Sequence, residues 1–416
     1  MTKEKSTVPR LRFPGFTDAW KQRKLGEVAE KISQKNLDRQ YVETFTNSAE
    51  FGIISQRDFF EKNISSLDNI SGYYIVSPDD FVYNPRISNL APVGPIKRNK
   101  LGRVGVMSPL YTIFRFSDIH LDFVEKYFDT TIWHRYMELN GDSGARSDRF
   151  AIKDSVFKGL PIPLPTLPEQ EAIGSFFSDL DQLITLHQRK LDDVKELKKA
   201  LLQKMFPKGN GNDFPELRFP EFTDAWKQRK LGEVATFAKG NGYSKKDLVI
   251  EGSPIILYGR LYTKYETVIS EVDTFVSVED NKNSVVYSEG GEVLVPASGE
   301  SSLDIARASV VAKKGIILGG DINIIRLHSE IFPVFLALTI SNGKQQKGLS
   351  KRAQGKSVVH LHNSDLKKVD LDFPTLPEQE AIGSFFSDLD QLITLHQRQL
   401  DHLKLLKKAL LQQMFI

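Results

Sequence analysis

The sequence predicts an α+β fold in which two mixed α/β domains, related by a pseudo-two-fold axis, are separated by an antiparallel coiled coil of two long helices. Three observations lead to this prediction. The segment Pro165–Arg189 recurs letter for letter at Pro374–Arg398. A second segment, Leu11–Ala29, recurs at Leu217–Ala235 with one substitution. The sequences between these repeats have diverged, so one duplicated framework carries two different inserts.

The composition is that of a soluble globular protein with more than one domain. The chain has 416 residues, which exceeds the roughly 100–200 residues of a typical domain. Hydrophobic residues make up 40% of it, but no apolar run approaches the roughly 18 residues of a membrane span, and the polar start has no apolar signal core. Cysteine is absent, which excludes disulfides, cysteine-ligated zinc and thiol catalysis and fits a cytoplasmic location. The net charge is only +3, so contact with nucleic acid depends on local basic patches.

Five segments follow from the repeats and from the residues between them. We expect a first domain over residues 1–165, a spacer helix over 166–206, a linker over 207–216, a second domain over 217–374 and a second spacer helix over 375–416. The linker is rich in proline and glycine, which end the first helix and allow the chain to turn. A whole domain followed by its helix has therefore been duplicated.

Each spacer helix is predicted from its first turn and from a sustained apolar pattern. Thr166-Leu-Pro-Glu169 and Thr375-Leu-Pro-Glu378 match the capping box, with proline in the first turn. Apolar residues then recur at spacings of three and four, as in a coiled-coil seam. They are Ile173, Phe177, Leu180, Ile184, Leu191, Val194, Leu201 and Met205, and in the second copy Ile382, Phe386, Leu389, Ile393, Leu400, Leu403, Leu410 and Met414. Helices of roughly 60 Å overshoot a single domain, so we expect them to pack on each other rather than only on their own domains.

Polar residues interrupt this apolar seam at His187 and Lys198, and their copies are His396 and Lys407. Two interpretations remain open. Polar seam residues commonly fix the register of a coiled coil at a cost in stability. Alternatively, these side chains extend along the edge of the seam to reach water.

Both inserts contain short predicted strands followed by a helical stretch. In the first insert the strands are 51–55, 80–83, 103–107 and 111–116, and the helical stretch is 122–139. In the second they are 255–258, 292–295, 308–311 and 322–327, with a helical stretch at 332–341. The shared order with different residues indicates one fold that presents two surfaces.

Searches for catalytic and cofactor-binding motifs fail. Gly355-Lys-Ser resembles the end of a phosphate-binding loop, but Ser350 stands where that loop needs glycine. His360 and His362 would share one face of a strand, but no third metal ligand is near them in the sequence. We therefore expect no catalytic residue, no metal site and no cofactor bound by this chain.

The positive signals concern the binding of polyanions. Lys97–Arg103 is a compact basic turn between two predicted strands. Ser143–Arg149 aligns with Arg352–Val358, and both are small, flexible and basic segments ahead of a long helix. Tyr258–Lys264 corresponds to Ser55–Arg57 of the first domain. A charge run is often only a solvated face, but patches at matching positions of two diverged domains favour contacts with phosphates and base edges.

The segment Leu11–Trp20 and its copy Leu217–Trp226, here called the lead segments, are aromatic and nearly identical. They either staple each domain to its helix or form a docking surface that is present twice. A packing role tolerates volume-conserving swaps, so near-identity favours a shared partner, although recent gene conversion gives the same result. The candidate partner-binding residues are Phe13, Phe16, Trp20, Phe219, Phe222 and Trp226.

This layout resembles the specificity (S) subunit of a type I restriction–modification system. The resemblance covers essentially the whole chain. It is carried by the diverged domains and by four repeated motifs, at Leu167–Glu171, Leu376–Glu380, Trp20–Val28 and Trp226–Val234. It implies two target recognition domains, each reading one half of a split sequence in double-stranded DNA, with the two helices as the spacer between them.

The resemblance also implies partners. Two methyltransferase (M) subunits would bind the repeated segments and carry S-adenosylmethionine, and two restriction (R) subunits that use ATP and Mg would join them. The chain itself would be a non-catalytic DNA-recognition subunit. The residues expected to contact DNA are Arg57, Arg86, Arg98, Lys100, Arg146 and Arg149 in the first domain, and Tyr258, Arg260, Tyr262, Ser298, Lys351, Arg352, Gln354 and Lys356 in the second.

Two other functions remain open at this point. The same fold would serve a non-enzymatic scaffold whose coiled coil pairs two protein-binding domains. An enzyme with an unrecognised site in one insert is disfavoured, because no set of titratable groups converges or repeats in the sequence.

Overall fold

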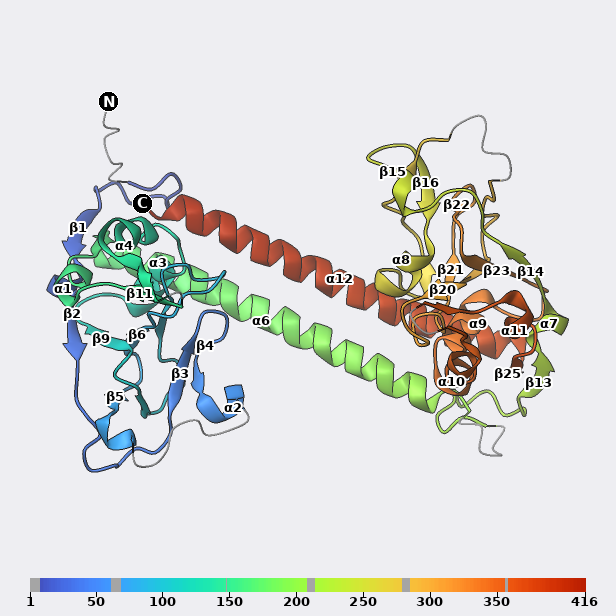
Figure 1. Ribbon diagram of the computed structural model, residues 1–416, viewed down its shortest axis with the longest axis horizontal. Coiled ribbons are helices and arrows are strands. Elements are labelled where there is room, and N and C mark those ends of the chain that lie inside the picture. The colour runs from blue at the N-terminus through green and yellow to red at the C-terminus, as the bar shows by residue number, and fades with distance from the viewer. Residues whose placement is uncertain (1–7, 61–68, 147, 208–213, 279–284, 356–357) are drawn as a thin grey trace. The chain divides into compact units, whose positions relative to one another are not determined.

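The structure, a computed structural model, describes residues 8–60, 69–146, 148–207, 214–278, 285–355 and 358–416 (Figure 1). The chain divides into two compact units. Unit 1 comprises Met1–Leu186 together with Leu400–Ile416, and unit 2 comprises His187–Gln399. The division passes through both long helices, so each unit contains a part of each helix.

Unit 1 is built around a four-stranded antiparallel sheet with the order β2–β9–β6–β7. These strands are β2 (Ala29–Ile32), β9 (Thr112–Phe116), β6 (Phe81–Tyr83) and β7 (Ile96–Arg98). Four two-stranded ladders surround the sheet. They are β1 (Lys21–Lys24) with β12 (Pro161–Leu164), β3 (Phe45–Ser48) with β4 (Gly52–Ser55), β5 (Tyr74–Val76) with β8 (Gly105–Met107), and β10 (Asp142–Arg146) with β11 (Arg149–Ala151).

The core of unit 1 lies between this sheet and helix α3 (Leu121–Phe128). Phe81 and Phe114 from the sheet and Phe123 and Phe128 from α3 are all buried in one cluster. The unit also contains a 3-10 turn at Ile70–Gly72 and four short helices. The helices are α1 (Leu25–Val28), α2 (Gln56–Phe60), α4 (His134–Asn140) and α5 (Asp154–Phe157).

Unit 2 has the same construction with more strands. A five-stranded sheet has the order β14–β23–β19–β21–β17, and a four-stranded sheet has the order β15–β18–β16–β22. The first contains β14 (Ala235–Lys239), β23 (Ile322–Leu327), β19 (Val293–Pro296), β21 (Ser309–Val311) and β17 (Val268–Ile269), and the second β15 (Leu248–Val249), β18 (Phe275–Val276), β16 (Ser253–Ile256) and β22 (Ile317–Leu318). Two ladders complete the unit, β13 (Lys227–Lys230) with β25 (Asp370–Phe373) and β20 (Ser298–Gly299) with β24 (Val359–His360).

Helix α9 (Pro333–Ile340) is the buried helix of unit 2. Seven of its eight residues are buried, and six of these pack in the same cluster as the β19 and β23 side chains. The other helical segments of this unit lie nearer to solvent. They are α7 (Leu231–Val234), α8 (Tyr258–Thr263), α10 (Gly343–Arg352), α11 (Asn363–Leu366) and a 3-10 turn at Lys245–Asp247.

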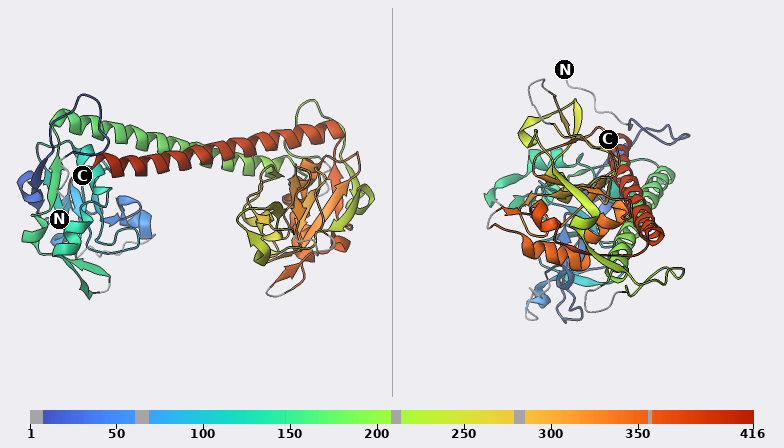
Figure 2. Two further views of the ribbon diagram at one scale, coloured as in Figure 1. Left: turned by 90° about the horizontal axis from the view of Figure 1, so that it is seen from above. Right: turned by 90° about the vertical axis from the view of Figure 1, so that its right-hand side faces the viewer.

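The two predicted long helices are confirmed as α6 (Leu167–Lys204) and α12 (Leu376–Met414). In unit 1 the last turns of α12 lie beside the first turns of α6 (Figures 1 and 2). Met414 and Phe415 are buried there in one cluster with Phe177. In unit 2 the last turns of α6 bring Met205 and Phe206 into the core in the same way. Each core is therefore completed by the end of the helix that follows the other insert.

The helix parts inside each unit run antiparallel. In unit 1 the rings of Phe177 and Phe415 are 6.3 Å apart, and one turn further along α6 Asp181 pairs with Lys407 of α12 at 2.6 Å. The second contact lies later on α6 and earlier on α12. The same reversal is present in unit 2, where Lys198 contacts Asp390 and His187 faces His396 with ring centroids 5.6 Å apart.

The polar seam residues thus lie opposite polar residues of the other helix. Lys198 pairs with Asp390 in unit 2, and its copy Lys407 pairs with Asp181 in unit 1. Lys198 is only 15% exposed and Lys407 only 23% exposed. This geometry supports the first of the two interpretations, in which the lysines fix the helix register.

The mixed α/β class of both units is confirmed. The eight predicted strands correspond to β4, β6, β8 and β9 in unit 1 and to β16, β19, β21 and β23 in unit 2. The sequence did not predict helix α10, whose end falls in a segment expected to be flexible.

Within the described ranges, no helix combines the length and apolarity needed to cross a membrane.

Candidate nucleic-acid interface

In the basic turn of unit 1, Arg98 forms ion pairs within the protein. Arg98 ends β7, and its guanidinium contacts Asp79 at 2.5 Å and Asp122 at 2.6 Å. Glu125 lies 3.4 Å away, and the Arg98 side chain is only 13% exposed. Burial opposes the charge, but the carboxylates of Asp79 and Asp122 overcome it and raise the pKa of Arg98. Three carboxylates therefore hold this guanidinium inside the protein, which argues against the predicted contact between Arg98 and a base.

Lys100 lies close to Arg98 and is more accessible. Its ammonium is 3.2 Å from Glu125, and its side chain is 55% exposed. An exposed ion pair of this kind is worth little and exchanges readily. Lys100 thus remains a reasonable candidate for a phosphate contact.

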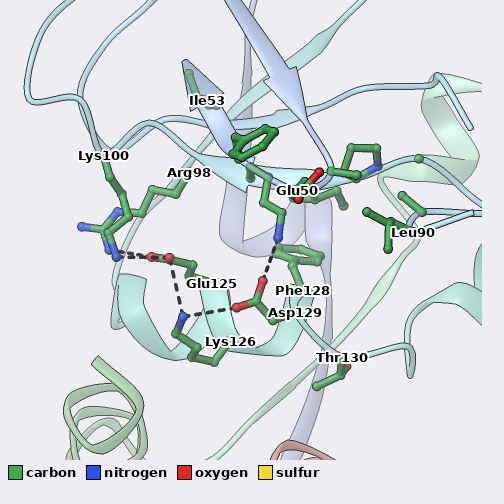
Figure 3. Close-up of a pocket in the computed structure, with 18 of the residues that line it drawn as sticks. Glu50, Ile53, Leu90, Arg98, Lys100, Glu125, Lys126, Phe128, Asp129 and Thr130 are labelled. Atoms are coloured by element: carbon green, nitrogen blue, oxygen red, sulfur yellow. Dashed lines mark hydrogen bonds and ion pairs between the residues drawn. The ribbon is translucent and has the colours of Figure 1, made fainter. Parts of the chain in front are cut away.

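A cavity of about 780 Å³ lies next to this turn and is lined by charges of both signs (Figure 3). Lys126 donates to Asp181 at 2.6 Å and to Asp129 at 3.2 Å. Lys97 also donates to Asp129, at 2.9 Å. In Figure 3, dashed lines join the Lys126 ammonium to the carboxylates of Glu125 and Asp129. The basic residues here are neutralised by their acidic partners, so the cavity has little net charge with which to attract DNA.

Arg86 and Arg149 are brought together by the β10–β11 hairpin. Arg86 forms a backbone bridge with Arg149, and the side chain of Asp148 is 3.5 Å from Arg86 and 3.9 Å from Arg149. The Arg86 side chain is 66% exposed. Arg146 pairs with Arg149 through the backbone of the hairpin. This hairpin is therefore the best-formed cluster of predicted DNA contacts in unit 1, whereas Arg57 lies elsewhere, exposed on α2.

In unit 2, helix α8 carries three of the predicted residues, Tyr258, Arg260 and Tyr262. Arg260 pairs with Asp273 at 2.5 Å, and hydrogen bonds from Lys264 and Arg260 lower the pKa of Asp273 to about 2. Arg260 is thus engaged in an ion pair, but at 32% exposure it remains within reach of solvent.

Ser298 is buried on β20 and is 3.0 Å from the ring Nδ1 of His360 on β24. Gln354 forms a backbone bridge with the same histidine, with hydrogen bonds of 3.2 and 2.8 Å. Gly355 follows with φ of +132°, and a Cβ there would lie 1.9 Å from the carbonyl oxygen of Val358, so this tight loop needs glycine. The structure therefore groups Ser298, Gln354 and His360. Gln354 and His360 are both exposed, and His360 is a surface or base-reading candidate that the list of predicted DNA contacts left out.

Lys351 and Arg352 are both exposed at the end of α10, next to this group. Lys356 lies outside the described residues. Sequence reasoning missed the lysines that α10 and the end of α6 gather around one groove of unit 2. The available signal was the spacing of Lys344, Lys347 and Lys351, which puts them on one face of a helix.

The lead segments are largely packed against their own units. Trp20 and Trp226 are 5% and 6% exposed, so neither indole is available to a partner as it stands. Phe13 packs edge-on against Phe176, with ring centroids 5.6 Å apart. The second copy repeats this contact between Phe219 and Phe385, and Phe16 and Phe222 are half-buried. Stapling is therefore observed for the tryptophans, and partner binding by the four phenylalanines stays a prediction.

Titratable side chains do not form a metal-binding cluster in the part of the chain that the structure describes. No three His, Asp or Glu side chains there are placed to share a metal ion. Most of the perturbed pKa values belong to ion pairs and tyrosines; burial raises the pKa of Tyr83 and Tyr127, and burial also lowers the pKa of His134.

Comparison with known proteins identifies the family of the chain. The family model for the type I restriction modification DNA specificity domain matches residues 17–196 and again 223–405. Two curated relatives come from Methanocaldococcus jannaschii. The type I restriction enzyme MjaVIII specificity subunit is 22% identical over 62% of this chain and 62% of its own length, and the putative type I restriction enzyme MjaX specificity subunit is 25% identical over 63% and 60%. The chain thus aligns with about three fifths of the length of these relatives.

Two solved structures share the fold. The S subunit of a type I restriction–modification system from M. genitalium has a TM-score of 0.62 at 14% identity, covering 98% of this chain and 99% of that one. A chain from a study of the assembly of the type I R–M system has a TM-score of 0.50 at 15% identity, covering 95% and 97%. Because one family model matches both halves of the sequence, the chain belongs to the type I restriction modification DNA specificity family.

Proposed function

We propose that this chain is the DNA-specificity subunit of a type I restriction–modification enzyme and that its two inserts read the two halves of a bipartite target in double-stranded DNA. One observation carries the proposal. The same DNA-specificity model matches the chain twice, over two segments whose inserts differ in sequence. Two related folds with different surface residues are what two different half-sites require.

The exposed polar residues described above support a DNA contact in each unit. In unit 1 the exposed Arg86 bridges the half-buried Arg149 of β11, and in unit 2 Arg352 at the end of α10 and Gln354 just after it are both exposed. Arginine pairs with guanine edges and glutamine with adenine edges in the major groove, and each good bidentate pair discriminates by about 1–3 kcal/mol.

We further propose that the chain is not itself an enzyme and acts through partner subunits. Two methyltransferase (M) subunits would bind the repeated segments and supply S-adenosylmethionine, and two restriction (R) subunits would supply the reactions that use ATP and Mg. The repeated lead segments support two equivalent docking sites, since Phe13, Phe16 and their copies Phe219 and Phe222 keep partly exposed rings.

Methylation mapping tests the proposal directly. The chain is produced together with the adenine methyltransferase subunit of its own system, and modified adenines are mapped by long-read sequencing. We expect one split motif with two constant halves and a fixed gap. Methylation that is absent, or that persists unchanged when this chain is omitted, would contradict a specificity role and favour a protein-binding scaffold.

An exchange of the second insert provides the matched control. Residues 236–358 are replaced by the corresponding insert of another family member, with both repeats retained. We expect one half of the methylated motif to change while the other half and the gap stay the same. A change in both halves would contradict the assignment of one half-site to each insert.

A further inference from the structure

Unit 2 contains a groove that is lined mainly by residues outside the set predicted to contact DNA. It has a volume of about 1060 Å³ and lies between the last turns of α6 and helix α10. Of the sixteen described residues that line it, seven are lysines and one, Glu216, is acidic. The lysines are Lys195, Lys198, Lys199, Lys204, Lys344, Lys347 and Lys351. We call this feature the lysine groove.

Most lysines of the lysine groove form no ion pair with a described residue of the protein. Lys198 pairs with Asp390, and Lys344 pairs with Asp372 at 3.0 Å. Among the residues that the structure describes, the other five lysines make no ion pair, and all five are exposed. Like charges gathered without counter-charges repel one another, and an anionic ligand relieves that repulsion.

The cavity of unit 1 shows what a neutralised set of lysines looks like. There Lys126, Lys97 and Lys407 are each within 4 Å of Asp129 or Asp181. Those lysines hold the core of unit 1 together and have little charge left for a ligand. The lysine groove therefore differs in kind from the cavity of the related unit.

The first turn of α10 adds to the positive potential. Asn342 is the N-cap of this ten-residue helix and makes no side-chain capping hydrogen bond. Asn342, Gly343 and Lys344 all line the groove. The positive end of the helix dipole therefore lies beside the lysines, and such helix starts favour phosphate groups.

Nucleic acid fits the lysine groove better than an acidic protein segment. Lysine is depleted at protein–protein interfaces, whose energy comes mainly from buried aromatic and arginine anchors. Protein–DNA interfaces are instead strongly positive, and lysine meets phosphate as a point charge. The end of α10 also leads directly into Arg352 and Gln354, so a phosphate contact here would adjoin the proposed base contacts.

We propose that the lysine groove binds the phosphate backbone of duplex DNA beside the half-site that unit 2 reads. This inference rests on the proposed function, because it assigns a second, sequence-independent contact to the same DNA. Lys195 and Lys199 on α6 and Lys347 and Lys351 on α10 would each neutralise a phosphate. The contact would position the duplex, while the residues after α10 would read its bases.

The matched control comes from the duplication itself. Lys404 and Lys408 of α12 are the copies of Lys195 and Lys199, and they are equally exposed but lie outside the groove. The experiment compares the full chain, in complex with its methyltransferase, as Lys195→Gln/Lys199→Gln and as Lys404→Gln/Lys408→Gln. The probe is a short fluorescent duplex that lacks the methylated motif, and anisotropy gives its affinity over a range of KCl concentrations.

The slope of log affinity against log salt is the readout. We expect it to decrease by about 0.9 for each phosphate that a substituted lysine no longer neutralises, so by about 1.8 for Lys195→Gln/Lys199→Gln, and to stay unchanged for the α12 variant. Lys195→Arg/Lys199→Arg keeps the charges and should keep the slope. An unchanged slope for the groove variant, an equal decrease in both variants, or loss of the methyltransferase in place of DNA affinity would overturn the inference. If the unmodified complex binds neither this duplex nor one that carries the methylated motif, the proposed function itself fails.

Discussion

Arg12 holds the buried carboxylate of Glu169 with two parallel hydrogen bonds, from Nε to Oε1 at 2.6 Å and from Nη2 to Oε2 at 2.7 Å. Glu169 lies in the first turn of α6 and its side chain is completely buried. In unit 2, Arg218 holds Glu378 with the same pair of bonds, both at 2.6 Å. The near-identity of the lead segments and helix starts thus has a structural cause, since each lead segment is tied to the start of its helix.

The neighbouring glutamine repeats the same principle. Gln170 donates to the carbonyl of Pro165 at 3.0 Å and accepts from the backbone N–H of His120 at 3.1 Å. Gln379 makes the equivalent bonds to Pro374 and Phe332, both at 2.9 Å. The glutamate and glutamine of the repeated Leu-Pro-Glu-Gln-Glu motif therefore serve as internal anchors between helix and insert.

Substituting Arg12 with alanine should strongly destabilise the protein. The change leaves the Glu169 carboxylate buried without a cation, which costs about 3–5 kcal/mol. Denaturant unfolding followed by circular dichroism measures the loss. Arg10→Ala removes a nearby exposed arginine and should change the unfolding free energy by less than about 0.5 kcal/mol.

A double-mutant cycle separates the ion pair from the loss of side-chain packing. In the Glu169→Gln background, Arg12→Ala should cost clearly less than it does in the unmodified chain. Equal costs in both backgrounds would show that the charge pair contributes nothing and that Arg12 acts through packing alone.

Acid should weaken unit 1 through Asp129 and Asp181. Burial alone would raise the pKa of Asp129, but the charges of Lys97, Lys126 and Lys407 overcome it and hold that pKa below its usual range. The pKa of Asp181 is lowered in the same way against its burial, chiefly by Lys126. Because both folded-state pKa values lie below the unfolded ones, their stabilisation is present above about pH 4 and is lost as the pH falls further.

This pH dependence is measured by denaturant unfolding between neutral pH and about pH 3. Asp129→Asn should lower the stability at neutral pH and flatten its decline in acid. Asp179→Asn is the control, because Asp179 is exposed on α6 and forms no ion pair in the described residues. If the unfolding free energy of Asp129→Asn falls in acid as steeply as that of the unmodified chain, the Asp129 carboxylate is not the source of the acid sensitivity.

The long helices could be predicted from the sequence because helix formation depends on the spacing of residues that are close together in the chain. A capping box and an apolar repeat need no knowledge of distant residues. The environment of Arg98 could not be predicted in this way. Asp79, Asp122 and Glu125 reach it only after the chain has folded, so an arginine in a basic turn forms a partly buried network of ion pairs.

Helix α10 was missed for a related reason. Its sequence is polar and contains Gly348, so its local helix propensity is low. The helix is stabilised by tertiary packing, because Leu349 is completely buried in the core of unit 2 and Gln345 donates to the carbonyl of Asp370 at 3.2 Å. The lysine groove could not be predicted either, because it is formed by α6 and α10, which are far apart in the sequence.

The seam pair of Lys198 and Asp390 should contribute mainly to helix register. Both side chains are at least 85% buried, and Thr267 also donates to Asp390 at 2.9 Å. Lys198→Met leaves the carboxylate buried without its cation and should cost about 3 kcal/mol. The combination Lys198→Met/Asp390→Leu removes both charges and should restore most of that stability, because an apolar pair of similar volume replaces a buried ion pair at little cost.

Differential scanning calorimetry of the two variants checks this prediction. The melting temperature of the double variant should exceed that of Lys198→Met. If the double variant melts at a lower temperature than Lys198→Met, the two substitutions destabilise the protein additively, and the lysine and the aspartate act independently. The copy of this pair in unit 1, Lys407 and Asp181, offers a second test, although there Lys126 also contacts Asp181 and should reduce the effect of substituting Lys407.

Arg352 and Arg98 should respond oppositely to substitution, although both were predicted to contact DNA. Arg352 is exposed at the end of α10, so Arg352→Ala should leave the melting temperature unchanged and weaken binding of the methylated motif by about 1–3 kcal/mol. Arg98→Ala leaves three carboxylates without their shared cation, so it should lower the melting temperature. Thermal melts and anisotropy titrations with the cognate duplex separate the two effects. If Arg352→Ala binds the cognate duplex as tightly as the unmodified chain, this arginine does not read the half-site, and the loop around Gln354 and His360 would have to do so without it.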